Sequence, residues 1–168
     1  MKTQSRIERD QLFLDVAALF GQRSTCPRAQ VGAVAVQDGR IVASGYNGAP
    51  AGMPHCTEVG CNVLVEWDPP KFPEGHDPAD IPPPPENVKS HCTRAVHAEA
   101  NVIAWSARTG VALKGSEMYL THTPCSTCTK LIINSGIKSV HFGNNYGHDG
   151  GLKLLYAGGV LVFLPKTV

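Results

Sequence analysis

Hydrophobic and polar positions along the chain form a pattern in which short strands and helices take turns. Short apolar runs between turn residues predict strands, and apolar positions that recur every three or four residues predict helices. The predicted elements are a helix that ends near Gly21, strands at 31–36 and 40–44, a helix at 94–109, a strand at 117–121, a helix at 126–135, a strand at 138–142, a helix at 151–157 and a strand at 160–164. Strand-helix-strand units in the second half imply a sheet that is parallel in part, with helices on both faces. The predicted fold class is therefore α/β, with a five-stranded mixed sheet.

Local signals mark the first helix and the hairpin that follows it. Ser5 and Glu8 have the spacing of a capping box. The apolar positions behind this box are Leu12, Val16, Leu19 and Phe20. Asp38-Gly39 stands between the first two predicted strands and is a strong signal for a tight turn. We therefore expect a helix followed by an antiparallel hairpin at the start of the fold.

Composition adds mainly exclusions to this picture. The chain has 168 residues, of which 42% are hydrophobic and 17% charged, so it can bury a core and does not have the composition of a disordered chain. Its net charge of +1 offers no basic excess for a nucleic-acid backbone or an anionic membrane. The polar N-terminus is unlike a signal peptide, and no apolar run reaches the length of a membrane helix. We expect one domain over residues 1–168, located in the cytoplasm.

One segment differs from the rest in composition. Residues 67–88 hold eight of the thirteen prolines, including four in a row at 82–85. Proline removes backbone donors and fixes φ, so this segment is not expected to form a helix or a central strand. We interpret it as a loop inserted into the domain.

Two short motifs carry the candidate chemistry. His97-Ala98-Glu99 belongs to one predicted helix, and Cys125 and Cys128 stand at the start of the next. Two cysteines three positions apart at a helix start can bind one ion, and His97 adds a nitrogen ligand. Thiolate and imidazole favour zinc over magnesium or calcium. Three protein ligands leave the fourth tetrahedral position for water, as in catalytic zinc sites.

Glu99 is the candidate proton-transfer residue. An acidic side chain beside a metal-activated water can take the proton from the water and pass it to a leaving group. The alternative is a purely structural zinc site, with Glu99 as a solvated acid in the first turn of a helix.

These motifs resemble those of the cytidine and deoxycytidylate deaminase superfamily, in which His-x-Glu is followed by Pro-Cys-x-x-Cys. The resemblance extends to residues 24–27, 31–34, 45–52, 91–101 and 135–138. It covers nearly the whole chain apart from the proline-rich segment. It implies the three-layer α-β-α fold of that superfamily.

The resemblance also implies a reaction, which is the hydrolysis of dCMP to dUMP and ammonia that feeds dTMP synthesis. His97, Cys125 and Cys128 would hold the zinc, and Glu99 would protonate N3 of the ring and then the departing amine. The implied substrate-binding residues are Ser24, Arg28, Asn47, Ala98 and Tyr146. Asn47 would bind the deoxyribose, and the 5′-phosphate would lie near the side chains of Ser24, Arg28 and Tyr146.

Members of this family are often hexamers that dCTP activates, together with Mg²⁺, and that dTTP inhibits. The resemblance places this control at Gly45, Tyr46, Gly48, Trp105 and Arg108. The alternative for these residues is structural, with a tight turn after a strand and Trp105 in the core or at a subunit interface.

Four cysteines remain outside the first metal group, and they are Cys26, Cys56, Cys61 and Cys92. Unpaired thiols in a cytosolic protein more often share a metal than stand idle. A site with four cysteines would be closed and therefore structural. His55 or His91 could replace one of the cysteines, and buried thiols that act as small hydrophobic residues are the alternative.

Other functions stay open from the sequence. The candidates are a deaminase of free cytidine or deoxycytidine, of 5-substituted dCMP or of adenosine in tRNA, and a zinc module that binds nucleotides without catalysis. The nucleoside enzymes usually carry Cys-Ala-Glu where this chain has His97, and a tRNA enzyme should present a basic surface. The presence of Glu99 favours an enzyme over a silent module.

Overall fold

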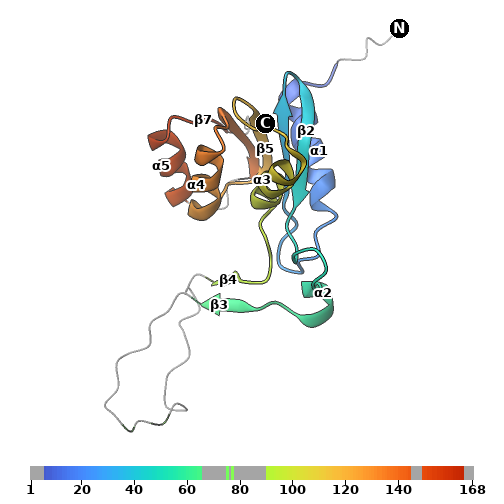
Figure 1. Cartoon of the computed structure of the whole chain (residues 1–168), viewed down its shortest axis with the longest axis vertical. Coiled ribbons are helices and arrows are strands. Elements are labelled where there is room, and N and C mark those ends of the chain that lie inside the picture. The colour runs from blue at the N-terminus through green and yellow to red at the C-terminus, as the bar shows by residue number, and fades with distance from the viewer. Residues whose placement is uncertain (1–5, 66–74, 76, 78–89, 145–148, 165–168) are drawn as a thin grey trace.

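The computed structural model describes residues 6–65, 75, 77, 90–144 and 149–164, which form a mixed sheet flanked by helices (Figure 1). The helices are α1 (Arg9–Gly21), α2 (Cys56–Val59), α3 (Ala98–Thr109), α4 (Ser126–Asn134) and α5 (Asp149–Ala157). The strands are β1 (Gly32–Gln37), β2 (Arg40–Tyr46), β3 (Val63–Val65), β4 (Ser90–Cys92), β5 (Glu117–His122), β6 (Ser139–Asn144) and β7 (Leu161–Phe163). The five-stranded sheet has the order β2-β1-β5-β6-β7, antiparallel from β2 to β5 and parallel from β5 to β7. The predicted α/β class with a five-stranded mixed sheet is confirmed.

Side chains that alternate along the strands divide the core into two layers, one on each face of the sheet. On β1, Val34 and Val36 face α1 together with Tyr119 of β5, whereas Ala33 and Ala35 face the opposite side. The opposite layer continues into α3, α4 and α5 through Ala98, Val102, Ile132 and Leu155. Figure 1 shows α1 on one side of the sheet and α3, α4 and α5 on the other. The expected arrangement with helices on both faces is confirmed.

α1 approaches the sheet so closely that small residues form its contact. A Cβ at Gly32 of β1 would lie 1.8 Å from the carbonyl oxygen of Ala17, so only glycine fits there. Ala17 and Gly21 are buried, whereas Leu12 and Leu19 are 43% and 60% exposed. The apolar pattern that predicts this helix therefore does not coincide with its buried face at these two leucines.

The start of α1 differs from the prediction. The helix begins at Arg9 with Glu8 as its N-cap, so the predicted capping box, with its cap at Ser5, is wrong. Ser5 itself lies outside the described residues. The strands of the main sheet, α4 and α5 agree with the predicted ends within two residues.

α3 also begins later than predicted, at Ala98 rather than at residue 94. The reason is a pairing between Val96 and Gly48, in which the Gly48 N–H donates to the Val96 carbonyl at 3.1 Å and the Val96 N–H to the Gly48 carbonyl at 2.9 Å. This antiparallel bridge keeps the chain extended up to His97, which becomes the N-cap of the helix.

β3 and β4 form a two-stranded antiparallel ribbon that the sequence pattern did not predict, and α2 precedes it. Figure 1 shows this ribbon apart from the main sheet. The proline-rich segment 67–88 connects the two strands and, except for Gly75 and Asp77, lies outside the described residues. None of the described helices is long and apolar enough to span a membrane.

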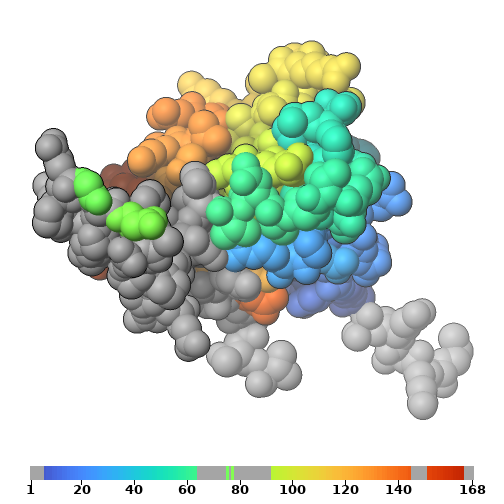
Figure 2. Space-filling model, turned by 90° about the horizontal axis from the view of Figure 1, so that it is seen from below, coloured from blue at the N-terminus to red at the C-terminus, as the bar shows by residue number. Residues whose placement is uncertain are grey.

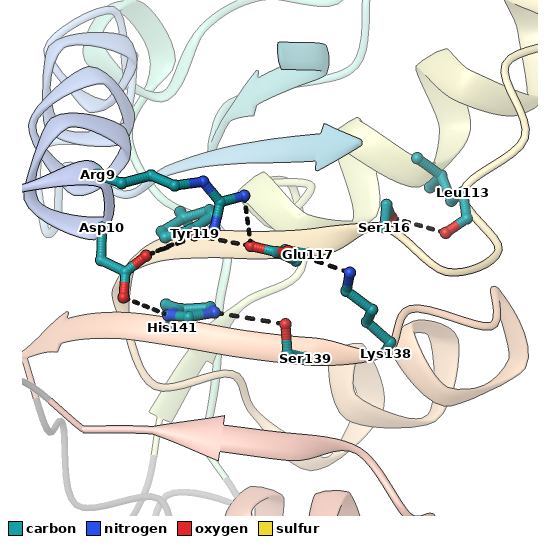
Figure 3. Close-up of polar contacts among 9 residues, drawn as sticks. All are labelled: Arg9, Asp10, Leu113, Ser116, Glu117, Tyr119, Lys138, Ser139 and His141. Carbon is teal, nitrogen blue, oxygen red and sulfur yellow. Dashed lines mark hydrogen bonds and ion pairs between the residues drawn. The ribbon is translucent and has the colours of Figure 1, made fainter. Parts of the chain in front are cut away.

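A polar network on one face of the sheet fastens α1 to β5 and β6 (Figure 3). The hydroxyl of Tyr119 lies 2.9 Å from a carboxylate oxygen of Asp10 and 2.9 Å from one of Glu117. Arg9 contacts the Glu117 carboxylate at 2.9 Å. Asp10 lies 3.6 Å from His141, whose ring stacks on that of Tyr119 with 4.3 Å between the centroids. These contacts hold the first turn of α1 over the middle of the sheet.

His141 should make the stability of the fold depend on pH. Burial lowers the pKa of His141, Arg9 adds to this shift, and the carboxylates of Asp10 and Glu117 oppose it. Because an unfolded histidine has a pKa of about 6.5, the unfolded chain binds more protons than the folded one below that pH. The free energy of unfolding should therefore decrease as pH falls from about 6.5 through the folded-state pKa, and then level off.

The measurement is urea unfolding at a series of pH values, for the wild type and His141→Phe. The phenylalanine keeps the stacked ring and removes the titration, so the decrease in unfolding free energy below about pH 6.5 should be smaller in the variant. His122, whose pKa is also lowered by burial, is present in both proteins and cancels in the comparison. Equal pH dependence in the two proteins would contradict the prediction.

Candidate metal centre and active site

Three candidate metal ligands lie at the N-termini of two helices. His97 is the N-cap of α3, Cys125 is the N-cap of α4, and Cys128 lies in the first turn of α4. The Nδ1 atom of His97 lies 3.5 Å from the Sγ atom of Cys125 and 3.4 Å from that of Cys128. All three ligand atoms lie within 4.8 Å of one another. The structure therefore brings together the three residues that were predicted to bind the catalytic metal.

The spacing of these atoms matches a tetrahedral zinc ion. With Zn–S near 2.3 Å and Zn–N near 2.05 Å, a tetrahedral angle places sulfur and nitrogen ligands about 3.6 Å apart. The observed distances of 3.5 and 3.4 Å fit without rearrangement. Three protein ligands leave one position of the tetrahedron for water or substrate, as in a catalytic rather than a structural site.

The protonation of the ligands also suits a cation. Hydrogen bonding from Cys128 lowers the pKa of Cys125 to about 3, and the His97 ring acts in the same direction while burial opposes it. The pKa of Cys128 is raised by its hydrogen bond to Cys125 and by burial. The thiolate of Cys125 in turn raises the pKa of His97. A divalent cation would favour two thiolates and a neutral imidazole, so metal binding would release protons.

Glu99 is a buried carboxyl group beside the three ligands. It is the second residue of α3, and its side chain interacts with His97, Cys125 and Cys128. The residue is 4% exposed, and burial raises its pKa. A carboxyl group with a raised pKa next to an activated water can accept and return a proton near neutral pH. The arrangement therefore suits proton transfer during hydrolysis.

Close packing against β2 fixes the position of α3. A Cβ at Gly45 would lie 2.7 Å from the carbonyl oxygen of Ala98, which is too close for any side chain. Ala98 itself is fully buried. One helical turn after His97, the side chain of Asn101 donates to the Tyr46 carbonyl at 2.7 Å. Sequence analysis missed Asn101, although its four-residue spacing from His97 places it on the same helical face. Gly45 and Tyr46, predicted to take part in regulation, thus have a visible role in holding α3 in place.

Two predicted substrate-binding residues connect the 24–31 loop to the end of β2. The hydroxyl of Ser24 donates to the Asn47 carbonyl at 2.9 Å. The Asn47 side chain accepts the Val31 N–H at 2.9 Å and donates to the Ala29 carbonyl at 3.0 Å, and the residue is 6% exposed. Both side chains therefore hold the loop in place, and their contact with substrate remains a prediction.

The other predicted residues divide into those near this loop and those away from it. Arg28 lies exposed on the same loop, and Tyr146 lies outside the described residues. Trp105 is 51% exposed in the second half of α3, and the Arg108 guanidinium lies 5.8 Å from the centre of its ring. The cation–π pair of Trp105 and Arg108 does not join the metal centre.

A second group of possible metal ligands lies beside the first. Its members are Cys56 in α2, Cys61 between α2 and β3, and Cys92 in β4. The three sulfur atoms lie within 4.8 Å of one another. Cys26 is buried and close enough for its charge to raise the pKa values of Cys56 and Cys61, but it is not part of this group of three. His55 is the N-cap of α2 and does not join the group either, and the side chain of His91 lies outside the description. In Figure 2, the green chain around α2 lies against the yellow-green chain that leads into α3.

The fold and the site together define a class of protein. A His-Cys-Cys group at two helix N-termini, with a buried carboxyl beside it and one open coordination position, is the arrangement of a metal-dependent hydrolytic enzyme. Residues 7–144 match the model of the cytidine and deoxycytidylate deaminase zinc-binding region. The chain therefore belongs to the cytidine and deoxycytidylate deaminase family, and the metal that this match supports is zinc.

Individual relatives agree with this assignment. The chain is 37% identical to ComE operon protein 2 of Bacillus subtilis (strain 168), over 94% of this chain and 71% of that protein. It is 40% identical to the deoxycytidylate deaminase of Mycobacterium phage D29, over 81% of this chain and 94% of that one. Among solved structures, it is similar to the dCMP deaminase of cyanophage S-TIM5 in complex with dCMP and dUMP, with a TM-score of 0.72, 29% identity and coverage of 96% of this chain and 100% of that one.

Removal of the Glu99 carboxylate should decrease turnover and leave zinc binding unchanged. Glu99→Gln keeps the size and the hydrogen-bonding capacity of the side chain but cannot transfer protons. We expect normal zinc content and a decrease in kcat of at least about 100-fold, the usual contribution of general acid–base catalysis. Zinc is measured by elemental analysis and turnover by ammonia release. Near-normal turnover in the zinc-loaded variant would refute the assigned role.

Proposed function

We propose that this chain hydrolyses dCMP to dUMP and ammonia. The observation that carries the proposal is the group of His97, Cys125 and Cys128 with the buried Glu99 beside it, at distances that fit a catalytic zinc. The choice of dCMP is supported by relatives that are themselves deoxycytidylate deaminases, including the phage D29 enzyme and the cyanophage enzyme whose structure holds dCMP and dUMP.

In this reaction, three residues bind the metal and one transfers protons. When bound, zinc lowers the pKa of a water molecule and so supplies a nucleophile near neutral pH. His97, Cys125 and Cys128 would hold the ion. Glu99 takes one proton from the attacking water and delivers it to N3 of the cytosine ring, where it stays in the product. Glu99 then takes the second proton of this water, now on the oxygen at C4, and delivers it to the amine that leaves from C4. Since it is buried, its carboxyl group is positioned without competition from bulk water.

The test is a comparison of dCMP, deoxycytidine, CMP and cytidine as substrates of the zinc-loaded enzyme. Ammonia release and the ultraviolet change from cytosine to uracil are measured for each. We expect kcat/KM for dCMP to exceed that for deoxycytidine by at least about tenfold, since a charge-assisted phosphate contact contributes about 1.5–3 kcal/mol. Activity on deoxycytidine alone would assign the chain to nucleoside deamination. Inactivity on all four would refute the proposal and direct attention to 5-substituted dCMP or tRNA.

We further propose a second, structural zinc at Cys56, Cys61 and Cys92, with Cys26 as the fourth ligand. The Sγ atoms of Cys56 and Cys92 are 3.9 Å apart, and two sulfur ligands on a tetrahedral zinc lie about 3.8 Å apart. All six cysteines of the chain are free thiols, which is consistent with metal binding in a reducing compartment and supports a cytoplasmic location.

Zinc content distinguishes the two sites. The wild type should bind two zinc ions per chain, measured by elemental analysis after dialysis. Cys61→Ser should bind one and show a lower unfolding temperature, because structural zinc stabilises the fold. Cys125→Ser should also bind one, but with turnover abolished. A wild-type content of one zinc per chain would contradict the structural site.

Regulation and assembly belong to the same proposal. We propose activation by dCTP with Mg²⁺, inhibition by dTTP, and a hexameric assembly whose product feeds dTMP synthesis. Support comes from the exposed pair of Trp105 and Arg108 on α3, which offers an aromatic face and a cation to a nucleotide or to a neighbouring subunit. Gly45 and Tyr46 on β2 lie next to the same helix.

A further inference from the structure

The first turn of α5 packs against the start of α4, its neighbour in Figure 1, through a glycine. Gly151 is the third residue of α5, and it is buried. A Cβ at Gly151 would overlap the carbonyl oxygen of Pro124 and would lie 3.1 Å from Oγ1 of Thr129. Since Pro124 presents backbone at this point, no side chain can bend out of the way. Only glycine therefore allows α5 to come this close to α4.

The two residues that enclose Gly151 are sequence neighbours of the two cysteine ligands. Pro124 directly precedes Cys125, and Thr129 directly follows Cys128. The side chains of Pro124 and Thr129 are fully buried. The Thr129 hydroxyl also donates to the Gly151 carbonyl at 3.4 Å. The first turn of α5 thus contacts the chain just before the first cysteine and just after the second.

α5 is itself held at its middle and at its far end. Leu155 is fully buried in the core layer that α5 shares with α3 and α4. Directly after the helix, Gly158 packs so closely that a Cβ there would lie 2.7 Å from Cδ1 of Ile133. Because protein interiors are close-packed, a helix fixed at these points cannot move aside as a whole. A side chain added at position 151 would therefore displace the Pro124 carbonyl.

Local helix preference does not explain a glycine at this position. Glycine is the least favourable residue in a helix apart from proline, and alanine is the most favourable. The φ angle of Gly151 is not positive, so alanine could adopt the same backbone conformation. The missing side chain therefore serves the contact with Pro124, and this contact adjoins a metal ligand.

We propose that Gly151 and Thr129 are positioning residues for the metal centre, because they fix Cys125 and Cys128 at the distances from His97 that one zinc ion requires. Metal–ligand distances tolerate changes of only about 0.2 Å, so a small displacement of the chain at either cysteine would weaken binding. This inference deepens the proposed function and rests on it for the catalytic role of the zinc.

The test is the zinc affinity of Gly151→Ala, measured without substrate. The full chain is equilibrated in chelator buffers of known free zinc, and bound zinc per chain is determined by elemental analysis. Cys125→Ser lacks one ligand of the catalytic site and so identifies the binding step that belongs to this site. In Gly151→Ala, we expect this step to require about 10- to 100-fold more free zinc, the usual effect of losing a group that orients a metal ligand.

Gly158→Ala is the matched control. It adds the same methyl group directly after the same helix, but the new Cβ meets the flexible end of the Ile133 side chain instead of backbone. The φ angle of Gly158 is not positive either, so alanine fits its backbone conformation. Its zinc affinity at the catalytic site should equal that of the wild type. An equal decrease in both variants would indicate general loosening of α5 and would overturn the proposal, as would an unchanged affinity in Gly151→Ala.

Thr129→Val tests the same contact without adding an atom at Gly151. Valine keeps the shape of the side chain and removes the hydroxyl that donates to the Gly151 carbonyl. We expect zinc affinity at the catalytic site to fall by a few-fold, and Thr129→Ser, which keeps the hydroxyl, to bind zinc like the wild type. If Gly151→Ala does not fold, this pair decides. An unchanged affinity in Thr129→Val, or equal losses in the valine and serine variants, would then overturn the proposal.

Turnover distinguishes this inference from the proposed function. A wild type that is inactive on dCMP, combined with the expected shift in zinc affinity, would refute the proposed function and support the positioning role. A loss of turnover in Gly151→Ala at unchanged zinc affinity would overturn the positioning role and leave the proposed function intact.

Discussion

The active site depends on one geometric constraint, which is that the N-termini of α3 and α4 must meet within the span of a single tetrahedral ion. Each helix contributes ligands from its cap or first turn, so a small rotation of either helix would separate the atoms. The Nδ1 atom of His97 lies 3.5 Å from the Sγ atom of Cys125 and 3.4 Å from that of Cys128, close to the spacing that zinc requires. Contacts between α3 and β2, outside the site, hold the His97 side chain at these distances. Gly45 lets the helix touch β2, and Asn101 donates to the Tyr46 carbonyl one turn behind the ligand.

The second cysteine group includes Cys92, which lies in the chain segment that leads into α3. Backbone N–H groups of Ala95 and Arg94 donate to the thiol of Cys92 and, against the effect of burial, lower its pKa to about 7. Only four residues separate Cys92 from His97, and Val96 within this stretch is paired with Gly48. The segment is thus held at both ends and in the middle. Contacts that hold Cys92 therefore also restrict the short segment that leads to His97.

The sequence alone predicted the main sheet, its helices and the grouping of His97, Cys125 and Cys128, because these depend on local periodicity and on rigid short-range chemistry. It failed where distant parts of the chain decide the outcome. The start of α3 was misplaced because the bridge of Val96 to Gly48, which joins residues far apart in the sequence, outweighs local helix preference. The packing of α1 depends on the Cβ that is missing at Gly32, a contact that no helical pattern reveals. Asn101 was missed because its partner is a backbone carbonyl on another strand.

The same distinction separates the metal ligands from the substrate contacts. A metal ion fixes its ligands at short distances in a known geometry, so residue type and spacing are enough to find them. A substrate contact requires a donor or acceptor that the fold has not already used, and the sequence does not record this. Asn47 and Ser24 show the difference, since their side chains bind the backbone of the 24–31 loop. The sequence therefore gives the same residue types for a group that binds substrate and for a group that holds the loop around it, and only the folded structure separates the two.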